Sequence, residues 1–305
     1  MLRNRKPIGL VLGGGGARGL SHIGVLRVFE DESIPIDLIV GSSMGALVGG
    51  AFAAGLDTYA LERRLEEFLE SPVFQDSALK SIREIQASRE LTLPQKIQAF
   101  FKNRLFLAQA MFRPGMLQPE EFQAMVDFFL PDIDVRDTQL RFRAVATDLR
   151  SAEPVVFSQG SLRKAVMASC AVPGALPPIR DGERLLADGG VIHMVPTTIA
   201  REEGARFVVA VSVTGGFKSA EKLSTAVDIY IRSANIGSFH LEKNLLKQAD
   251  VVILPRVGNL HWTDFELARD LVVEGERAAR AELPAIRKGL PVFRRLSRLH
   301  RLGHR

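Results

Sequence analysis

The chain has 305 residues, of which 46% are apolar and 25% charged, with a net charge of +5. This size and apolar content favour one domain with a large core over two domains. A single cysteine, Cys170, excludes an intramolecular disulfide framework and any metal site built from several cysteines. The positive charge favours an anionic partner, a membrane surface before nucleic acid, because no nucleic-acid-binding module is recognisable.

The first predicted strand, Pro7 to Leu12, runs into the glycine-rich turn Gly13-Gly-Gly-Gly-Ala-Arg-Gly19, and a helix is predicted from Leu20 to Phe29. Four consecutive glycines do not stabilise regular structure, but they let backbone N–H groups converge on an anion. The anion is either the oxyanion of a tetrahedral intermediate, with Arg18 nearby, or a dinucleotide pyrophosphate.

The dinucleotide interpretation depends on Gly14, Gly16 and Gly19, which satisfy G-x-G-x-x-G. It also requires an acidic ribose partner at the end of the second strand, and Asp37 lies at the beginning of that strand instead. The oxyanion interpretation is therefore preferred, and no cofactor or metal is expected.

A second turn, Gly41-Ser-Ser-Met-Gly45, fits G-x-S-x-G between a predicted strand, Asp37 to Gly41, and a predicted helix, Ala46 to Gly55. A serine on such a strand-to-helix turn adopts a strained backbone, and small neighbours allow close approach of the surrounding chain. Ser43 then lies at a helix N-terminus, where free N–H groups favour negative charge. The alternative is that Ser43 only caps the helix.

The stretch from Ser71 to Pro131 is the least sheet-like part of the chain. It predicts helices near the mouth of the site that Ser43 and the glycine-rich turn would form. It is either a cap or acyl-chain channel that touches lipid, or a helical layer whose aromatic residues enter the core, and the second interpretation is favoured. Its aromatic, aliphatic and basic residues include Phe100, Phe101, Leu105, Phe106, Leu107, Met111, Phe112, Lys96, Lys102, Arg104 and Arg113.

Later apolar runs predict further strands, and their continuous Val and Ile content is typical of parallel strands buried on both faces. The predicted strands are Phe142 to Thr147, Pro154 to Phe157, Phe207 to Val213 and Val251 to Leu254, with helices over Leu162 to Met167 and Leu267 to Ala281. The pattern indicates an α/β fold.

Another strand, in Leu185-Leu-Ala-Asp-Gly-Gly190, ends in an acid on a Gly-Gly turn. An isolated Asp-Gly is usually only a turn. Here the segment Ala168 to Pro178 precedes it, with small residues and prolines that suit close packing over a site. None of the six histidines stands in the late loop that would complete a Ser, acid, His order.

The basic tail, Pro291 to Arg305, has apolar residues near one helical face and five arginines elsewhere. At about 1 kcal/mol per arginine, such a tail would be attracted to an anionic leaflet, although a solvated, disordered tail is the alternative. No signal peptide is evident, so a cytoplasmic enzyme with peripheral membrane contact is expected. The sequence does not define the oligomeric state.

The order G-G-G-x-R-G, G-x-S-x-G and D-G-G, within residues 13–190, resembles the patatin-like phospholipase family. The resemblance implies a three-layer α/β/α fold with a mainly parallel sheet and a helical insertion at about 71–131. It implies a Ser-Asp dyad of Ser43 and Asp188 without histidine. It places an oxyanion hole at Gly14, Gly15, Gly16 and Arg18, with supporting positions at Gly41, Met44, Gly45, Gly189 and Gly190.

Three positions depart from the family pattern. Four glycines precede Ala17 rather than three, Leu176 stands where an aromatic residue is common, and His193-Met194 replaces paired asparagines. The replacement of the asparagines by His193-Met194 either reshapes the wall of the substrate pocket or brings His193 near the dyad.

The expected function is lipid acyl hydrolysis, of phospholipase A or lysophospholipase type, by residues 1–290, with 291–305 as the tail. Ser43 attacks the ester carbonyl while Asp188 takes its proton, which requires burial to raise the pKa of Asp188 above about 3.9. The alternatives are a general carboxylesterase, thioesterase or acyltransferase, and a catalytically idle lipid-binding regulatory protein.

Overall fold

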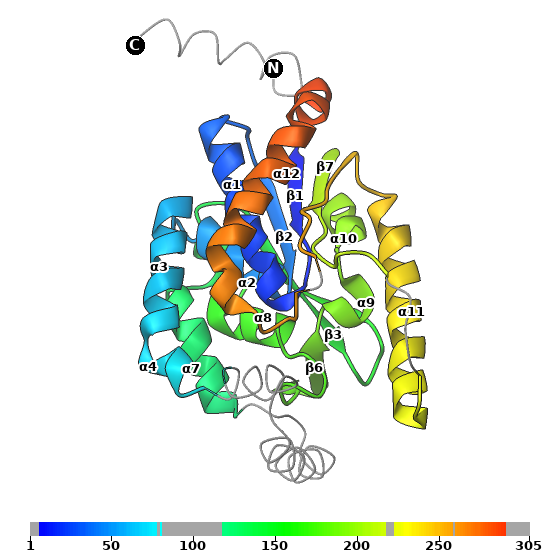
Figure 1. Ribbon diagram of the computed structural model, residues 1–305. Coiled ribbons are helices and arrows are strands. Elements are labelled where there is room, and N and C mark those ends of the chain that lie inside the picture. Colours follow the sequence, from blue (N-terminus) through cyan, green and yellow to red (C-terminus); the bar gives the residue numbers. More distant parts are fainter. Residues whose placement is uncertain (1–5, 78–79, 81–117, 218–222, 259, 291–305) are drawn as a thin grey trace, which may run out of the picture.

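The structure is a computed structural model that describes residues 6–77, 80, 118–217, 223–258 and 260–290. Its centre is one sheet in the order β5-β6-β3-β2-β1-β7-β8, with β4 paired to β3 (Figure 1). The strands are β1 (Ile8–Leu12), β2 (Leu38–Ser42), β3 (Phe142–Asp148), β4 (Pro154–Phe157), β5 (Ile179–Asp181), β6 (Arg184–Asp188), β7 (Phe207–Val211) and β8 (Val251–Ile253).

The middle of the sheet is parallel and its β5, β6 and β4 end is antiparallel. β3, β2, β1, β7 and β8 run parallel, whereas β4 and β6 both pair antiparallel with β3. The predicted mainly parallel sheet is therefore confirmed. The prediction that Pro154 to Phe157 is a buried parallel strand is wrong, because only a short turn joins it to β3, and such a turn connects antiparallel neighbours.

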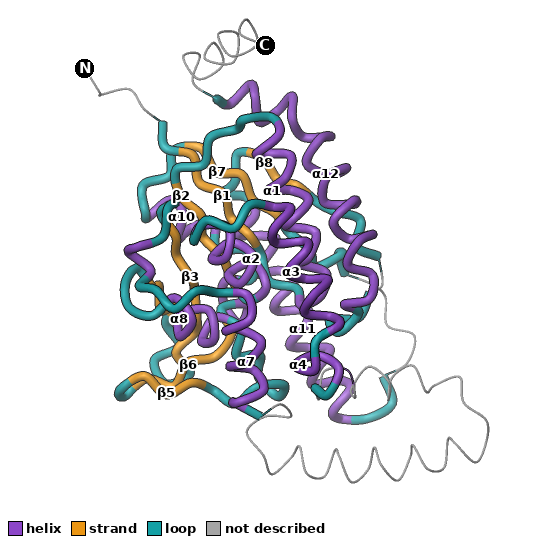
Figure 2. Tube along the Cα trace, turned by 90° about the vertical axis from the view of Figure 1, so that its left-hand side faces the viewer, coloured by secondary structure: helices purple, strands orange, loops and turns teal. Residues whose placement is uncertain are grey.

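The parallel strands are buried on both faces. Along β1, Leu10 and Leu12 enter one apolar core and Val11 enters the other, as alternation along a strand requires. Helices cover the two faces, and Figure 2 shows the strands between α10 on one side and α1 and α12 on the other. This makes the predicted three-layer arrangement.

The larger core packs against α1 (Ser21–Asp31), α2 (Met44–Ala53), α3 (Thr58–Glu70), α7 (Pro119–Phe129), α8 (Leu162–Ser169) and α12 (Ala268–Gly289). The smaller one packs against α10 (Thr197–Glu202) and the end of α11 (Ala226–Leu246). Two further short helices are α4 (Pro72–Gln75) and α9 (Gly190–His193). None of these described helices is long and apolar enough to cross a membrane.

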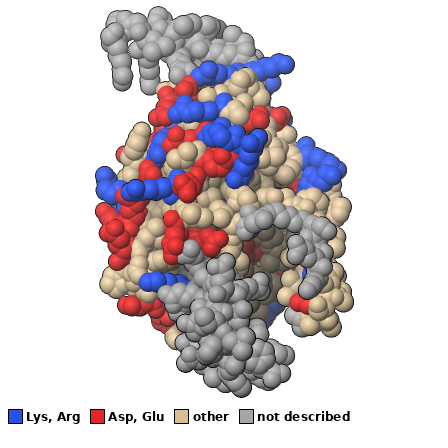
Figure 3. Space-filling view, viewed as in Figure 1, with Lys and Arg blue, Asp and Glu red and all other residues tan. Residues whose placement is uncertain are grey.

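α1 and α12 cross at two glycines. A Cβ on Gly24 would lie 1.9 Å from the Val272 carbonyl oxygen, and one on Gly275 would lie 1.9 Å from the Ser21 carbonyl oxygen. Beside the crossing, Arg27 donates to Glu62 at 2.6 Å and to Glu276 at 2.9 Å. Figure 3 shows the interleaved basic and acidic side chains over this side of the molecule.

The predicted helical insertion at about 71–131 is described only at its ends. α4 and α7 are helical as expected, and Phe74 and Phe129 are buried. The aromatic and basic residues predicted between positions 96 and 113 lie outside the described residues, as does the basic tail 291–305.

Candidate active site

Ser43 lies on the sharp turn between β2 and α2. Its backbone has φ 54° and ψ −127°, a strained conformation for a residue with a side chain, and it is 7% exposed. The flanking glycines allow this turn, since a Cβ on Gly41 would lie 2.5 Å from the Gly45 carbonyl oxygen and one on Gly45 would lie 2.1 Å from that of Leu12. The Ser43 N–H donates to Ser169 Oγ at 3.0 Å, so the turn is fixed by α8.

Asp188 ends β6, and the antiparallel pairing of β6 with β3 brings it beside Ser43. Thr147 of β3 donates its hydroxyl to the Asp188 carbonyl at 3.0 Å. The carboxylate Oδ1 accepts the Gly190 N–H at 2.6 Å, and Oδ2 makes no hydrogen bond within the described residues. Gly189 lies against β3, because a Cβ there would be 2.2 Å from the Val145 carbonyl oxygen.

The Asp188 carboxyl is an unusually basic acid. Burial raises its pKa from 3.8 to about 6, and the neighbouring Ser43 hydroxyl and Gly190 N–H oppose that rise only in part. Burial disfavours the ionised form because the interior solvates a charge poorly. Ser43 and Asp188, predicted from separate motifs, are therefore adjacent, with the carboxylate in the apolar surroundings expected of a base.

The glycine loop is held by three carbonyl groups from distant segments. Gly13 N–H donates to Val211 at 3.0 Å, Gly14 N–H to Met194 at 2.9 Å and Ala17 N–H to Trp262 at 2.8 Å. Gly13 thus continues the pairing of β1 with β7, and a Cβ there would lie 2.9 Å from the Val211 carbonyl oxygen, which accounts for the fourth glycine. The N–H groups of Gly15 and Gly16 make no recorded hydrogen bond within the described residues.

Two parts of the predicted oxyanion hole need correction. The Gly14 N–H is already bonded to Met194, so in this conformation it is not a free donor. The Arg18 guanidinium turns back to support the loop, donating to the Gly15 carbonyl at 3.1 Å and the Thr214 carbonyl at 2.9 Å. At the start of α2, the N–H groups of Met44 and Gly45 make no recorded hydrogen bond within the described residues.

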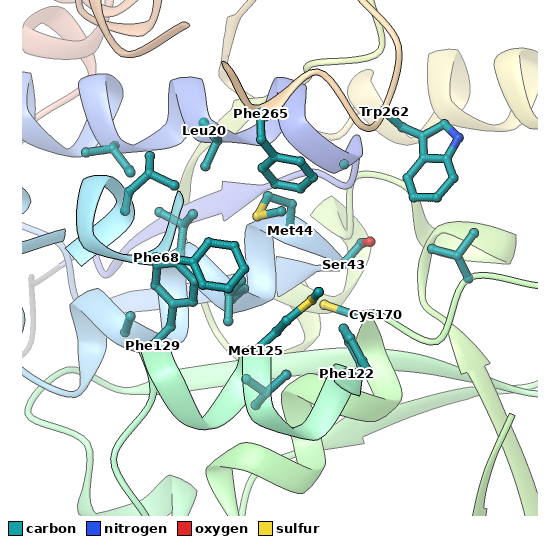
Figure 4. Close-up of a pocket in the computed structure, with 18 of the residues that line it drawn as sticks. Leu20, Ser43, Met44, Phe68, Phe122, Met125, Phe129, Cys170, Trp262 and Phe265 are labelled. Atoms are coloured by element: carbon teal, nitrogen blue, oxygen red, sulfur yellow. The ribbon is translucent and has the colours of Figure 1, made fainter. Parts of the chain in front are cut away.

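An apolar pocket opens beside Ser43, with a cavity volume of about 110 Å³. Figure 4 shows Phe68, Phe129, Met44 and Met125 gathered to one side of Ser43 and Trp262 on the other. Among the described residues that line it there is no charged side chain. The lining consists of Gly16, Leu20, Ile23, Ser43, Met44, Leu47, Val48, Ala51, Leu61, Leu65, Phe68, Phe122, Met125, Val126, Phe129, Cys170, Val172, Ala175, Leu176, Trp262 and Phe265.

At its described end, the insertion both lines this pocket and packs into the main core. α7 contributes Phe122, Met125, Val126 and Phe129 to the wall, and the same helix packs into the main core. Leu176, where the family pattern has an aromatic residue, also lines the pocket. Cys170 lies there too, and burial raises the pKa of its thiol, so it stays protonated and is a poor nucleophile.

Within the described residues, no histidine makes a recorded hydrogen bond with Ser43 or Asp188. His193 contacts the Thr198 hydroxyl at 3.2 Å, so the expectation that it lies near the dyad is not met by its contacts. His22, which sequence reasoning missed, donates from Nε2 to the Gly13 carbonyl at 2.8 Å, and burial lowers its pKa to about 4. It is therefore neutral near pH 7 and anchors the glycine loop. In the sequence, the position of His22 three residues after Gly19 was the signal that could have indicated this contact with the glycine loop.

The family model for patatin-like phospholipase matches residues 10–201. The chain belongs to the patatin-like phospholipase family.

Among curated relatives, the chain is 32% identical over 255 residues to patatin-like phospholipase domain-containing protein 6 of Mus musculus, covering 83% of this chain and 16% of that protein. It is 30% identical over 208 residues to lysophospholipase NTE1 of Yarrowia lipolytica, covering 68% of this chain and 13% of that protein. The chain thus spans less than a fifth of the length of these relatives.

Among solved structures, the chain is similar to VipD from Legionella pneumophila, with a TM-score of 0.45 and 15% identity, covering 92% of this chain and 67% of that one. It is also similar to the ExoU-SpcU complex of Pseudomonas aeruginosa, with a TM-score of 0.42 and 12% identity, covering 92% of this chain and 52% of that one.

Proposed function

We propose that this protein hydrolyses lipid acyl esters, with Ser43 as the nucleophile and Asp188 as the base. The observation that carries the proposal is a strained, buried Ser43 beside a buried carboxyl of raised pKa, at the base of a pocket without charged lining among the described residues. Membership of the family and the names of the relatives support the same class of reaction.

In the first step Ser43 Oγ attacks the ester carbonyl carbon and its proton passes to Asp188. Oδ1 is held by Gly190, so Oδ2, which has no hydrogen bond within the described residues, is the atom that receives the proton. A base works best when its pKa is near the working pH, and a pKa of about 6 is closer to that range than an ordinary aspartate.

The tetrahedral oxyanion is stabilised by backbone N–H groups. Gly15 and Gly16 supply donors from the glycine loop, and Met44 supplies one from the N-terminus of α2. Loss of one such donor typically costs about 10²- to 10³-fold in turnover. When the intermediate collapses, Asp188 returns the proton to the leaving alcohol, and a water molecule then hydrolyses the acyl-enzyme with Asp188 again taking the proton.

The apolar pocket gives the substrate class. A fatty acyl chain leaving the carbonyl at Ser43 would be surrounded by aliphatic, aromatic and methionine side chains. Burial of each methylene contributes about 0.8 kcal/mol, so longer chains bind more tightly until the pocket is full. This favours phospholipase A or lysophospholipase activity over general carboxylesterase activity.

A second part of the proposal is peripheral contact with an anionic membrane from the cytoplasmic side, supported by the net charge of +5. Deleting residues 291–305 is expected to weaken binding to anionic liposomes. An unchanged partition coefficient would contradict a membrane role for that segment.

The test of the proposed mechanism is labelling with a fluorophosphonate probe, read by intact mass, together with hydrolysis of a palmitoyl lysophospholipid. Wild type is expected to label and hydrolyse, whereas Ser43→Ala and Asp188→Asn do neither. Ser42→Ala is the matched control, because the Ser42 hydroxyl is buried without a hydrogen bond in the described part of the chain and its loss should leave activity within about twofold.

Each alternative has its own outcome. An active Asp188→Asn protein would exclude the Ser-Asp dyad. Four folded proteins that neither label nor hydrolyse would favour an idle lipid-binding protein. A wild type that labels but transfers its acyl group to a thiol or an added alcohol faster than to water would favour thioester or acyltransferase chemistry.

A further inference from the structure

Helix α11 is held by the protein at its C-terminal end and exposed over the rest of its length. At the held end, Glu242 accepts hydrogen bonds from the Ser212 and Thr214 hydroxyls, and the Leu245 carbonyl accepts one from the Thr197 hydroxyl at 2.6 Å. From position 226 to position 241, none of the described side chains is buried. These residues, the exposed segment of α11, therefore extend beyond the part of the protein that holds the helix.

The exposed segment begins with a capping box. The Thr225 hydroxyl accepts the Asp228 N–H at 3.1 Å, and the Asp228 carboxylate accepts the Thr225 N–H at 2.9 Å. Such a cap satisfies N–H groups that the start of a helix leaves unpaired. The start of α11 is thus specified by its own residues and does not depend on packing against the rest of the protein.

The exposed segment is apolar where a surface helix is normally charged. Its sequence from Ile229 to Leu241 contains one charged residue, Arg232, which stacks on the Phe217 ring. Tyr230 is 76% exposed, Ile231 53% and Ile229 52%, and Ile236 and Leu241 are exposed as well. A group of exposed apolar side chains of this kind marks an interaction surface.

The apolar side chains point to several sides of the helix. At 3.6 residues per turn, Ile229 and Ile236 share one side, and Tyr230 and Leu241 lie about 110° further round. Ile231 lies about 200° from Ile229, on a third side. A groove in a partner protein covers one stripe of a helix, whereas a fluid apolar phase contacts all sides at once. Exposure on three sides therefore favours a lipid surface over a protein groove.

The exposed segment lies at the end of the molecule that holds the dyad. Figure 1 shows α11 along one edge, with its N-terminal end beyond the carboxyl ends of the parallel strands. α11 packs beside α9, where Val191, three residues after Asp188, is exposed. Val172 is also exposed and lines the apolar pocket beside Ser43. Exposed apolar side chains therefore lie on α11, next to it on α9 and at the pocket.

We propose that the exposed segment of α11 inserts into the surface of a phospholipid bilayer and holds the apolar pocket against it. The proposal rests on the proposed hydrolysis of lipid acyl esters and names the surface by which the protein reaches that substrate. The contact is driven by burial of apolar side chains, so it does not require anionic lipid. This property distinguishes it from the proposed contact of residues 291–305.

The test measures the partition of the full chain onto phosphatidylcholine vesicles in high salt, which screens the attraction of basic residues. Replacing two exposed residues together, Ile229→Gln with Ile231→Gln, should lower the partition coefficient at least about 10-fold, because burial of one large aliphatic side chain contributes about that factor. Val273→Gln is the matched control. Val273 is exposed on α12, which packs in the larger core on the other face of the sheet, and its substitution should leave partition within about twofold.

Catalysis gives a second measurement on the same proteins. The double variant should keep kcat/KM for a soluble butyryl ester within about twofold, because none of its changes touches the dyad or the apolar pocket. Its hydrolysis of phosphatidylcholine in vesicles should fall with the partition coefficient. A double variant that hydrolyses vesicle lipid as fast as wild type would overturn the proposal.

The remaining outcomes separate the possible partners. Wild type that does not bind the vesicles, a partition coefficient unchanged in the double variant, or an equal loss in Val273→Gln would overturn the proposal. So would a wild-type dimer in sedimentation velocity that the double substitution dissociates, because these side chains would then contact a second copy of the chain. If partition behaves as expected but wild type neither labels with the fluorophosphonate nor hydrolyses the butyryl ester, the proposed function fails and the lipid contact stands.

Discussion

Replacing Asp188 with asparagine tests the buried carboxylate through stability as well as activity. Asparagine keeps an oxygen to accept the Gly190 N–H, and it removes the titrating group. Its amide nitrogen replaces Oδ2, which has no hydrogen bond within the described residues. The substitution therefore also changes the free energy of unfolding by an amount that does not vary with pH. The pH-dependent part of the difference then belongs to Asp188 alone.

The magnitude follows from the two pKa values. Asp188 has a pKa of about 6 when folded and 3.8 as a reference, so the native state holds its proton more tightly than the unfolded state. The free energy of unfolding of wild type therefore falls as pH rises from 3.8 toward 6. The full effect is about 3 kcal/mol, of which about 1.4 kcal/mol lies between pH 5 and pH 8.

The assay is urea unfolding of wild type and Asp188→Asn at half-unit steps between pH 5 and pH 8. The stability of Asp188→Asn relative to wild type should increase by about 1.4 kcal/mol across this range and level off above pH 7. In parallel, the kcat/KM of wild type should fall below a midpoint near pH 6, because the protonated carboxyl cannot act as a base. Parallel stability curves for the two proteins would refute the claim that burial keeps this carboxyl basic.

Three other changes test the packing around the site. Ser43→Gly should remove activity and raise the free energy of unfolding by about 1 kcal/mol in chemical denaturation, because glycine adopts the backbone of this turn without strain. A less stable variant would contradict the inference that the Ser43 backbone is strained. Gly24→Ala should lower the free energy of unfolding by about 2 kcal/mol or more, because the added Cβ meets the Val272 carbonyl. Its control is Gly237→Ala on α11, which has open space around it and should raise the free energy of unfolding by up to about 1 kcal/mol. Equal effects of the two substitutions would argue against the close helix crossing. Met125→Trp should reduce kcat/KM for palmitoyl esters at least about 10-fold, because the larger side chain fills the pocket that α7 lines. The kcat/KM for butyryl esters should stay within about twofold. Equal losses with the two esters would mean that the acyl chain of the substrate binds elsewhere.

The parts of the site that sequence could predict are those encoded in short, local patterns. The turns around Gly15, Ser43 and Asp188 each require particular small residues next to a strand end, and the structure places all three turns together at one edge of the sheet. Ser43 and Asp188 are adjacent because β6 pairs with β3, and no local sequence pattern contains that tertiary pairing.

The apolar pocket beside Ser43 could not be predicted in the same way. Its walls come from segments as distant as Leu20, Met125 and Trp262, and nothing in those side chains distinguishes a pocket wall from ordinary core. Helix α11 was also missed, since most of its residues are exposed and Ile229, Tyr230 and Ile231 follow one another without helical periodicity. The role of Arg18 changed for a similar reason, because its hydrogen-bond partner Thr214 is remote in sequence.

The three carbonyl contacts of the glycine loop also restrict its length. Gly13, Gly14 and Ala17 are tied to Val211, Met194 and Trp262, so only Gly15 and Gly16 lie between the attachments at Gly14 and Ala17. Inserting or deleting one residue there would move at least one N–H group off its carbonyl and rotate the remaining amides away from Ser43. Homologous chains are therefore expected to vary in the side chains around this loop far more readily than in the number of residues between Gly14 and Ala17.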